Sequence, residues 1–235
     1  MKTLVIIPAW NEEDNLLNTV RDLQENGEKI DLLVVNDCST DGTAALLREN
    51  GIPFLDLPVN LGIGGGVQSG YRYALERGYD IAVQFDGDGQ HMGAYLSALL
   101  APIQAGRADY TIGSRFLEGE GFQSSALRRL GIRFLSGLID ALCGVKVLDA
   151  TSGMRAVNRD LIALFAADYP QDYPEPEAIL AAGLRGYRVE EVPVRMRERQ
   201  GGVSSINPVR SVYYMIKVSL ALVLSRAMAG KGGGR

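Results

Sequence analysis

The stretch "DIAVQFDGDGQH", residues 80–91, decides how the rest of the chain is interpreted. Its first half is short and apolar, which is typical of a buried strand. Its second half places Asp86 and Asp88 two residues apart among glycines, with Gln90 and His91 directly after them. In open α/β sheets ligands collect at the carboxyl ends of strands. The stretch therefore predicts an α/β fold with a ligand site where this strand ends.

Segments of the same kind recur on both sides of it. Strand-like runs occupy 3–8, 30–35, 53–57, 80–85 and 109–113, and helix-like spacing occupies 12–26, 41–50, 66–77 and 92–105. Strands that alternate with helices imply right-handed crossovers and a mostly parallel central sheet with helices on both faces. We therefore expect one α/β domain, which suits a chain of 235 residues.

The alternation stops near residue 120. The later segments read as a helix at 125–144, a strand at 152–158, a helix at 174–186, a strand at 187–196 and a helix at 211–229. In the last helix Lys217 and Arg226 bracket only eight uncharged residues, whereas a membrane span needs about 20. We expect this helix to lie on a membrane surface, to pack on a partner or to cap the core.

Composition and charge narrow the function classes. Cys38 and Cys143 are far apart and lack histidine partners, which argues against a disulfide framework or a zinc site and favours a reducing cytoplasm. We expect no signal segment, because the first strand is followed at once by polar residues. Residues 1–184 hold 14 Lys/Arg and 25 Asp/Glu, whereas residues 185–235 hold 10 and 3. The basic end indicates either an anionic partner, such as phosphate groups or a membrane, or a solvated basic face.

The acidic pair at 86 and 88 does not fit a calcium loop. A calcium loop that began at Asp86 would need an oxygen ligand at its fifth position, Gly at its sixth and Glu at its twelfth. These positions hold Gln90, His91 and Ser97. Two uses remain: a pair of solvated turn acids, or ligands for Mg²⁺ or Mn²⁺ that is shared with substrate phosphates. Gly87 and Gly89 leave room for a diphosphate in the second case.

Polar clusters follow the other strands as well. In "IIPAWNEEDNL" (6–16) Asn11 suits a helix N-cap. In "VVNDCSTDGT" (34–43) Asp37 could accept hydrogen bonds from a base or a ribose. The run "NLGIGGGVQSG" (60–70) lacks both the dinucleotide fingerprint and the P-loop pattern. Its glycines indicate close approach of a ligand or a tight turn before a helix.

Taken together, six short motifs resemble family 2 glycosyltransferases, and within them the polyprenyl-phosphate sugar transferases. The motifs, in order, are "PAWNEE", "VVNDCSTDGT", "NLGIGGG", "QFDGDGQH", "DATSGMRAVN" and "RERQGGVSS". The resemblance covers about residues 3–206. It implies a GT-A fold, a UDP- or GDP-linked sugar donor, a Mg²⁺ or Mn²⁺ cofactor and inversion at the anomeric carbon.

Carried over by position, the resemblance implies a role for each matched residue. The residues at the nucleotide site would be Pro8, Ala9, Trp10, Glu12, Asp37 and Gly62. Those around the metal and the diphosphate would be Asp86, Asp88 and Gln90, with Arg199 and Ser204 closing on the phosphates. The catalytic set would be Asp88, Glu177 and Arg199. Arg115 and Arg155 are further candidates for acceptor or phosphate contacts.

The resemblance and the sequence pattern together divide the chain. Residues 1–206 would form a single GT-A domain, with a nucleotide-sugar half at 1–115 and an acceptor half at 116–206. Residues 207–229 would form the amphipathic helix, and residues 230–235 a disordered tail.

One departure from the family pattern leaves the acceptor open. The polyprenyl-phosphate enzymes usually carry Tyr, an aromatic residue and Gln before a Glu, where this chain has "DYPEPEAI" (172–179). The acceptor is expected to be polyprenyl phosphate at the cytoplasmic membrane face. A phosphate acceptor is already ionised and therefore needs little help from a general base. The alternative is a sugar hydroxyl of a lipid-linked glycan, with Glu177, or next Glu175, as general base. Either acid could instead help to cap a helix.

Two other function classes agree less well with the sequence. A phosphatase with Asp86 as nucleophile expects Thr or Val at position 90, and Gln90 argues against it. A non-catalytic nucleotide-sugar binder is disfavoured by the combination of Asp86, Asp88 and Arg199. We expect no nucleic-acid partner, a possible homo-oligomer, and no catalytic role for His91.

Overall fold

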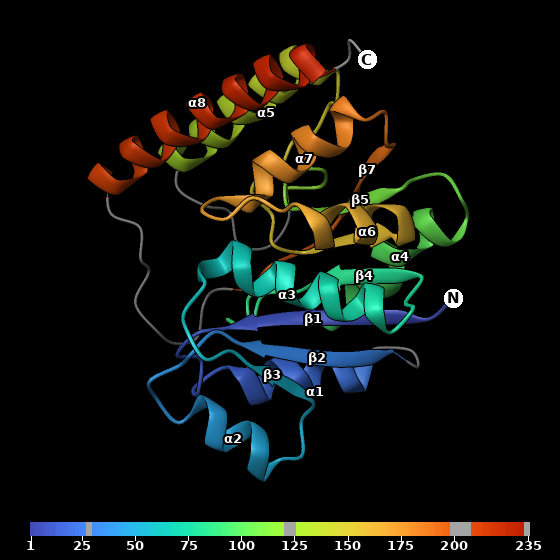
Figure 1. Ribbon diagram of the computed structural model, residues 1–235, viewed down its shortest axis with the longest axis vertical. Coiled ribbons are helices and arrows are strands. Elements are labelled where there is room, and N and C mark those ends of the chain that lie inside the picture. The colour runs from blue at the N-terminus through green and yellow to red at the C-terminus, as the bar shows by residue number, and fades with distance from the viewer. Residues whose placement is uncertain (27–29, 120–125, 198–207, 233–235) are drawn as a thin grey trace.

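The computed structural model describes residues 1–26, 30–119, 126–197 and 208–232, and it contains one seven-stranded sheet in the order β3-β2-β1-β4-β6-β5-β7 (Figure 1). The strands are β1 (Thr3–Ala9), β2 (Asp31–Asn36), β3 (Phe54–Asp56), β4 (Ile81–Gln84), β5 (Tyr110–Ser114), β6 (Arg155–Asn158) and β7 (Val189–Pro193). Each strand that the sequence predicts is present, although several boundaries differ by a few residues.

The pairing of the strands sets where the sheet can bind a ligand. Strands β1, β2, β3 and β4 are mutually parallel, and β5 is parallel to β7, whereas β6 runs antiparallel to both β4 and β5. Ala9 at the end of β1 lies opposite Asn36 at the end of β2, and Ile6 lies opposite Gln84 at the end of β4. The carboxyl ends of these three strands therefore meet at one edge of the sheet.

Helices cover both faces, as the alternation of strands and helices predicts. One face carries α1 (Leu16–Asn26), α2 (Thr43–Glu49) and α4 (Leu96–Gln104), and the other carries α3 (Gly62–Glu76) and α6 (Arg159–Ala167). Successive side chains of β1 alternate between the two cores: Leu4 and Ile6 pack on the α3 side, Val5 and Ile7 on the α1 side. This is the period of two that a strand imposes. The α/β fold with a mostly parallel sheet is confirmed.

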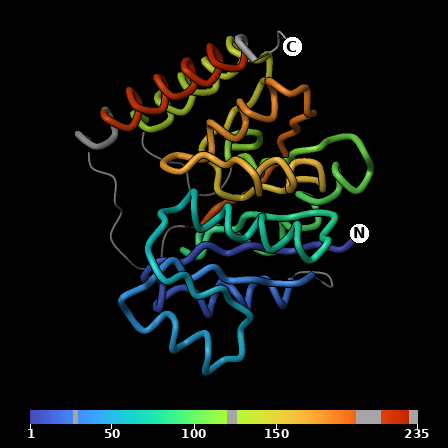
Figure 2. Tube along the Cα trace, viewed as in Figure 1, coloured from blue at the N-terminus to red at the C-terminus, as the bar shows by residue number. Residues whose placement is uncertain are grey.

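The later helices form a layer above α6. Helix α7 (Pro174–Leu184) packs against both α5 (Ala126–Cys143) and α8 (Pro208–Gly232), which lie side by side at one end of the molecule (Figures 1 and 2). The sheet continues without a break past residue 115, because β4 pairs with β6 and β6 with β5. The division into a nucleotide half and an acceptor half at that residue stays a prediction.

Three local features differ from the sequence prediction. Helix α3 begins at Gly62 instead of residue 66, because its glycines allow close packing: a Cβ on Gly64 would lie 2.1 Å from the carbonyl oxygen of Pro170. Helix α6 was not predicted, although Asn158 caps it by accepting a hydrogen bond from the backbone N of Leu161. Helix α8 extends to Gly232, so residues 230–232 continue a helix where a disordered tail was expected.

Candidate active site

The ends of β1, β2 and β4 meet closely enough to form one site. The backbone N of Asp37 donates to the carbonyl oxygen of Ala9 at 2.9 Å, which joins the ends of β2 and β1. A Cβ on Gly87 would lie 3.3 Å from the carbonyl oxygen of Pro8, so the loop after β4 packs directly on β1. The structure therefore brings together Pro8, Asp37 and the Asp86–Asp88 pair, as the sequence predicts for strand ends on one edge.

Asn11 and Cys38, just past the ends of β1 and β2, both adopt a left-handed backbone conformation with φ of 56°. Such residues carry strain that the surrounding structure must support. Here Asn11 Oδ1 accepts from the backbone N of Thr40 at 2.8 Å, and the backbone N of Asn11 donates to Ser39 Oγ at 3.0 Å. Asn11 thus ties two loops together, and because α1 begins only at Leu16, its expected role as the N-cap of that helix is wrong.

The residues predicted at the nucleotide site surround this edge. Trp10 has 56% of its surface exposed, which leaves its ring accessible to a base. The backbone N of Glu12 donates to Thr43 Oγ1 at 3.1 Å. Asp37 is buried, and its Oδ1 accepts from the backbone N of Leu61 at 2.7 Å, so it fixes the start of α3 beside Gly62.

Asp86 combines a fixed position with a partly exposed carboxylate. Its side chain is 35% exposed. A Cβ on Gly153 would lie 1.9 Å from Asp86 Oδ2, so only glycine fits behind the carboxylate. Burial opposes ionisation, but the His91 ring, the Gln84 amide and the charge of Arg155 together hold the pKa of Asp86 below the usual carboxyl value. Asp86 is therefore an ionised carboxylate at neutral pH.

Asp88 and Gln90 continue the loop along the same edge. Asp88 Oδ1 accepts from the backbone N of Gln90 at 3.1 Å, and the carbonyl oxygen of Gln90 accepts from the backbone N of Arg197 at 2.8 Å. The segment that leaves β7 is thereby attached to the acidic loop. Arg199 and Ser204, which the resemblance assigns to phosphate binding, lie outside the described residues.

The residues at this corner fit Mg²⁺ or Mn²⁺. Asp86, Asp88 and Gln90 offer two carboxylates and an amide oxygen, which are the hard ligands that these ions take. Three side chains are fewer than an octahedral ion needs, and such ions usually complete their shell with water and substrate phosphates. The metal roles of the three residues stay predictions that the chemistry of the donor set supports.

Arg155 lies fully buried behind the loop that carries Asp86 and Asp88, which we call the acidic corner. Its guanidinium donates four hydrogen bonds: to the hydroxyl of Tyr110, to the carbonyl oxygen of Glu175 at 2.7 Å, to that of Ala150 at 3.0 Å, and to that of Ser152. Although burial opposes its charge, nearby Tyr110 and Glu175 raise the pKa of Arg155, so it stays protonated. The side chain has no exposed surface for an acceptor; it joins the segments that surround Asp86 and supplies a buried positive charge.

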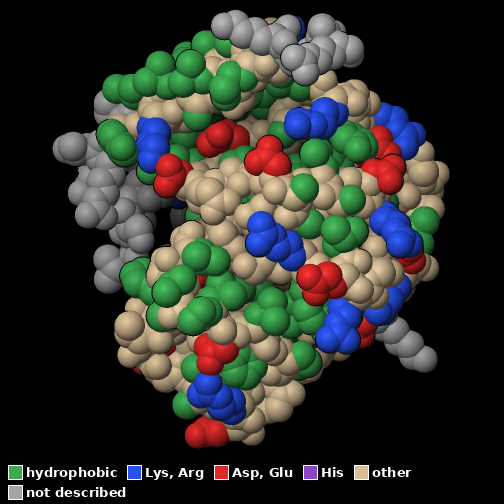
Figure 3. All heavy atoms as spheres, viewed as in Figure 1, with side chains coloured by type: hydrophobic (Ala, Val, Ile, Leu, Met, Phe, Trp, Pro, Cys, Tyr) green, Lys and Arg blue, Asp and Glu red, His purple; other side chains and the backbone are tan. Residues whose placement is uncertain are grey.

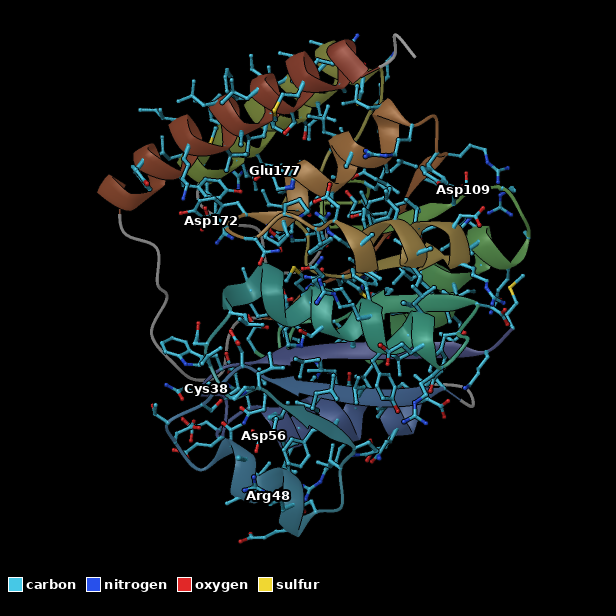
Figure 4. The ribbon with its side chains drawn as sticks, in the orientation of Figure 1. Cys38, Arg48, Asp56, Asp109, Asp172 and Glu177 are labelled. Carbon is cyan, nitrogen blue, oxygen red and sulfur yellow. The ribbon has the colours of Figure 1, made fainter. Side chains whose placement is uncertain are left out.

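The two glutamates of "DYPEPEAI" face different surroundings. Burial raises the pKa of Glu175, and the positive charge of Arg155 offsets part of that rise. The negative charge of Asp86 raises the pKa of Glu175 further, so Glu175 lies near the acidic corner. Burial likewise raises the pKa of Glu177, but the charges that act on Glu177 are those of Asp172 and Lys217. Figure 4 shows Glu177 and Asp172 close beneath α8. From the sequence alone, Glu177 ranks ahead of Glu175 as a general base. The charge of Asp86 acts on Glu175 and not on Glu177, so the geometry favours Glu175 for that role.

Arg115 is also placed differently from its expected role. It is buried, and its Nε and Nη2 each lie 2.6 Å from a different carboxylate oxygen of Asp149. Burial and the nearby charge of Arg115 lower the pKa of Arg128, which shows that the two guanidinium groups lie close together. The charge of Arg115 is therefore paired with Asp149 in the protein interior, and Arg128 at the start of α5 lies near that ion pair.

Sequence reasoning missed two polar residues of the site. Gln84 is fully buried at the end of β4, accepts from the Tyr169 hydroxyl at 3.2 Å and lies 3.5 Å from Asp86 Oδ1. The signal for Gln84 was present, because it is the one polar residue within the apolar run "IAVQF". Tyr169 gave no such signal, since it reaches Gln84 from a loop 85 residues away.

Comparison with known proteins agrees with this geometry. The model of the family described as glycosyl transferase family 2 matches residues 4–165. The polyprenol monophosphomannose synthase of Mycolicibacterium smegmatis is 34% identical over 228 residues, which cover 93% of this chain and 86% of the relative. The undecaprenyl-phosphate mannosyltransferase of Micrococcus luteus is 31% identical, with 88% of each chain covered.

A solved structure shares the fold at lower identity. Glucosyl-3-phosphoglycerate synthase from Mycobacterium tuberculosis, in complex with Mn²⁺, uridine diphosphate and phosphoglyceric acid, superposes with a TM-score of 0.71 at 20% identity. The match covers 96% of this chain and 78% of that one. The expected GT-A fold is therefore confirmed.

Proposed function

The chain belongs to glycosyl transferase family 2 and is a glycosyltransferase, and on that premise we propose that it transfers a sugar from a nucleotide donor to polyprenyl phosphate. The observation that carries the proposal is the acidic corner formed by Asp86 and Asp88, set beside the ends of β1 and β2. Two relatives whose names specify mannose transfer to a polyprenol or undecaprenyl phosphate match most of this chain. Their similarity supports a lipid-phosphate acceptor.

In the proposed reaction the acceptor attacks the anomeric carbon on the face opposite the departing diphosphate, which gives inversion. Trp10 and Asp37 border the base and ribose, and the glycines of the acidic loop leave room for the diphosphate. A Mg²⁺ or Mn²⁺ ion held by Asp86, Asp88 and Gln90 would offset the negative charge that gathers on the leaving group.

A donor and acceptor panel tests this function. The protein is incubated with UDP- and GDP-linked sugars, Mn²⁺ and undecaprenyl phosphate, and the lipid fraction is analysed by mass spectrometry. We expect a glycosylated lipid phosphate with one donor class. Release of nucleoside diphosphate without a lipid product would contradict the proposed acceptor.

The position of Glu175 favours one alternative, transfer to a sugar hydroxyl with a carboxylate as general base. Replacement of Glu175 by Gln separates the two acceptors. With a phosphate acceptor, which is already ionised, we expect turnover to fall less than about tenfold, whereas loss of a general base costs roughly 10²–10⁴-fold.

Turnover of Glu175→Gln is measured with undecaprenyl phosphate and with a lipid-linked sugar, and Glu177→Gln, which faces Lys217, is the matched control. A loss of more than about 100-fold confined to Glu175→Gln would support the hydroxyl acceptor.

We further propose that the enzyme binds the inner face of the cell membrane peripherally. Among the described residues, no helix is long and apolar enough to cross a bilayer. Large apolar side chains are nevertheless exposed along two adjacent helices, and we call them the α5–α8 surface: Leu127, Leu130 and Phe134 of α5, and Tyr213, Ile216, Leu220, Val223, Leu224 and Met228 of α8. Figure 3 shows hydrophobic side chains gathered along α8. Arg133 of α5 and Arg226 of α8 are exposed on the same two helices, which suits an anionic lipid interface.

Replacement of Leu220 and Leu224 by Glu should weaken membrane binding about tenfold or more, because both side chains would enter the interface. Co-sedimentation with vesicles that contain phosphatidylglycerol measures the bound fraction. Leu75→Glu, at a leucine of α3 with 41% exposure, is the control and should bind as the wild type does. Unchanged sedimentation of the double variant, with loss of a dimer in solution, would instead assign the α5–α8 surface to a second subunit.

A further inference from the structure

His91 is the only histidine of the chain and follows the acidic pair directly, yet the proposed reaction gives it no role. It is 2% exposed, and neither Nδ1 nor Nε2 has a hydrogen-bond partner among the described protein atoms. A buried polar group without a partner costs about 1–3 kcal/mol. Buried polar atoms are normally satisfied, so this ring calls for an explanation.

The ring is aimed at one of the predicted metal ligands. Nε2 of His91 lies 3.7 Å from Oδ2 of Asp86, just beyond hydrogen-bond distance. Gln84 Nε2 lies 3.5 Å from the other oxygen, Oδ1. Asp86 is thus held between two nitrogen groups while its carboxylate keeps an exposed side.

The position of the ring is fixed independently of Asp86. Phe85 packs against it with ring centroids 5.5 Å apart. The backbone N of Gly93, two residues later, donates to Asp22 Oδ2 of α1, and Thr19 Oγ1 of the same helix donates to the carbonyl oxygen of Gly87 at 3.2 Å. Helix α1 therefore anchors the chain on both sides of His91, so the ring can serve as a fixed reference for Asp86.

The burial of His91 argues against direct metal ligation. At 2% exposure the ring lies behind Asp86, whereas the open side of the carboxylate faces away from the protein interior. A nitrogen that sits behind a carboxylate ligand orients that ligand and is commonly found around protein metal sites.

We propose that His91 is a positioning residue for the metal site: its Nε2–H donates to Asp86 Oδ2 when a divalent cation draws the carboxylate into place, and this fixes the direction in which Asp86 binds the cation. The inference rests on the proposed metal-dependent function. A shortening of the Nε2–Oδ2 distance by less than 1 Å makes the bond and satisfies one of the two orphaned nitrogens. His91 also borders a cavity of about 30 Å³ that Asn15, Thr19 and Asp22 line, which is large enough for a water molecule.

Two substitutions separate the ring from its hydrogen-bond donor. His91→Phe keeps an aromatic ring against Phe85 but has no donor, whereas His91→Gln keeps a donor but has no ring. Binding of Mn²⁺, alone and with UDP or GDP, is measured by electron paramagnetic resonance on untagged protein. We expect His91→Phe to weaken Mn²⁺ binding roughly 10–100-fold, the usual effect of losing such a partner, and His91→Gln to bind within about threefold of the wild type.

The wild-type protein offers a second readout, because a single histidine gives one set of imidazole signals in a ¹⁵N spectrum. We expect Mg²⁺ to shift the Nε2 signal in the wild type and to leave it unchanged in Asp86→Asn. A purely structural role for His91 predicts no such shift. Thermal melting of each variant establishes that the protein compared is folded.

The outcomes distinguish this inference from the function on which it rests. If folded His91→Phe binds Mn²⁺ as the wild type does while Asp86→Asn does not, the metal site stands and the role of His91 is overturned. If His91→Phe is unfolded, an unshifted Nε2 signal in the wild type overturns the role by itself. If the wild type binds no Mn²⁺ under any of these conditions, the proposed metal site fails, and the role of His91 fails with it.

Discussion

Asp88→Asn is expected to lower metal-stimulated sugar transfer by at least ~100-fold, the scale on which loss of one group that stabilises transition-state charge acts. Asn keeps the side-chain oxygen that accepts from the backbone N of Gln90 at 3.1 Å, so the turn after Gly87 should survive. What Asn loses is the negative charge that a carboxylate offers to a divalent ion. The expected loss therefore lies in turnover and metal affinity, with the fold intact.

Release of nucleoside diphosphate and formation of the glycolipid are measured over a range of Mn²⁺ concentrations. Asp160→Asn is the matched control, since Asp160 is an exposed acid in the first turn of α6, remote from the strand ends of the site. Circular dichroism and the melting temperature check that both variants fold. If Asp88→Asn turns over as fast as the wild type at every metal concentration, the catalytic role of the acidic pair is refuted.

The sequence predicts those parts of the molecule that depend on local pattern. The parallel half of the sheet follows from short apolar runs alternating with helices, and the location of the acidic corner follows from the rule that parallel strands end at one edge. Six motifs in order were enough to indicate the family. The family model and the relatives confirm it.

Contacts between segments that are distant in sequence could not be predicted from the local sequence pattern. Arg155 in "SGMR" has no neighbour in sequence that reveals its burial, because its partners at Tyr110 and Glu175 lie 45 and 20 residues away. The choice between Glu175 and Glu177 depends on the direction in which the first turn of α7 faces, and two acids two residues apart point to different sides of a helix. The glycines of α3 were expected to admit a ligand or to form a tight turn before a helix, because the contact of Gly64 with Pro170 leaves no trace in the local pattern.

Arg155→Met is expected to have the largest effect on stability of any single change near the site. The guanidinium is fully buried, and the carboxylates of Glu175 and Asp86 both lie within range of its charge. Methionine fills a similar volume, but it leaves these acids without a buried cation and removes four hydrogen bonds. Loss of one partner from a buried ionic cluster typically costs about 3–5 kcal/mol. For a chain of this size that corresponds to a fall in melting temperature of roughly 6–20 °C.

The charge contribution can be separated from the hydrogen bonds by a second substitution. If the charge of Arg155 compensates Glu175, the double variant Arg155→Met/Glu175→Gln should regain roughly 1 kcal/mol or more of the lost free energy of unfolding, because its Gln side chain carries no charge that needs a buried cation. Arg159→Met, at an arginine whose side chain is 65% exposed at the start of α6, is the control and should change stability by no more than about 0.5 kcal/mol. Denaturant unfolding of the four variants gives the free energies, with Glu175→Gln closing the cycle. A double variant no more stable than Arg155→Met would leave the bonds to Tyr110, Ala150, Ser152 and Glu175 as the whole contribution of Arg155. In that case the carboxylates of Asp86 and Glu175 would need another source of positive charge in the protein without a bound cation.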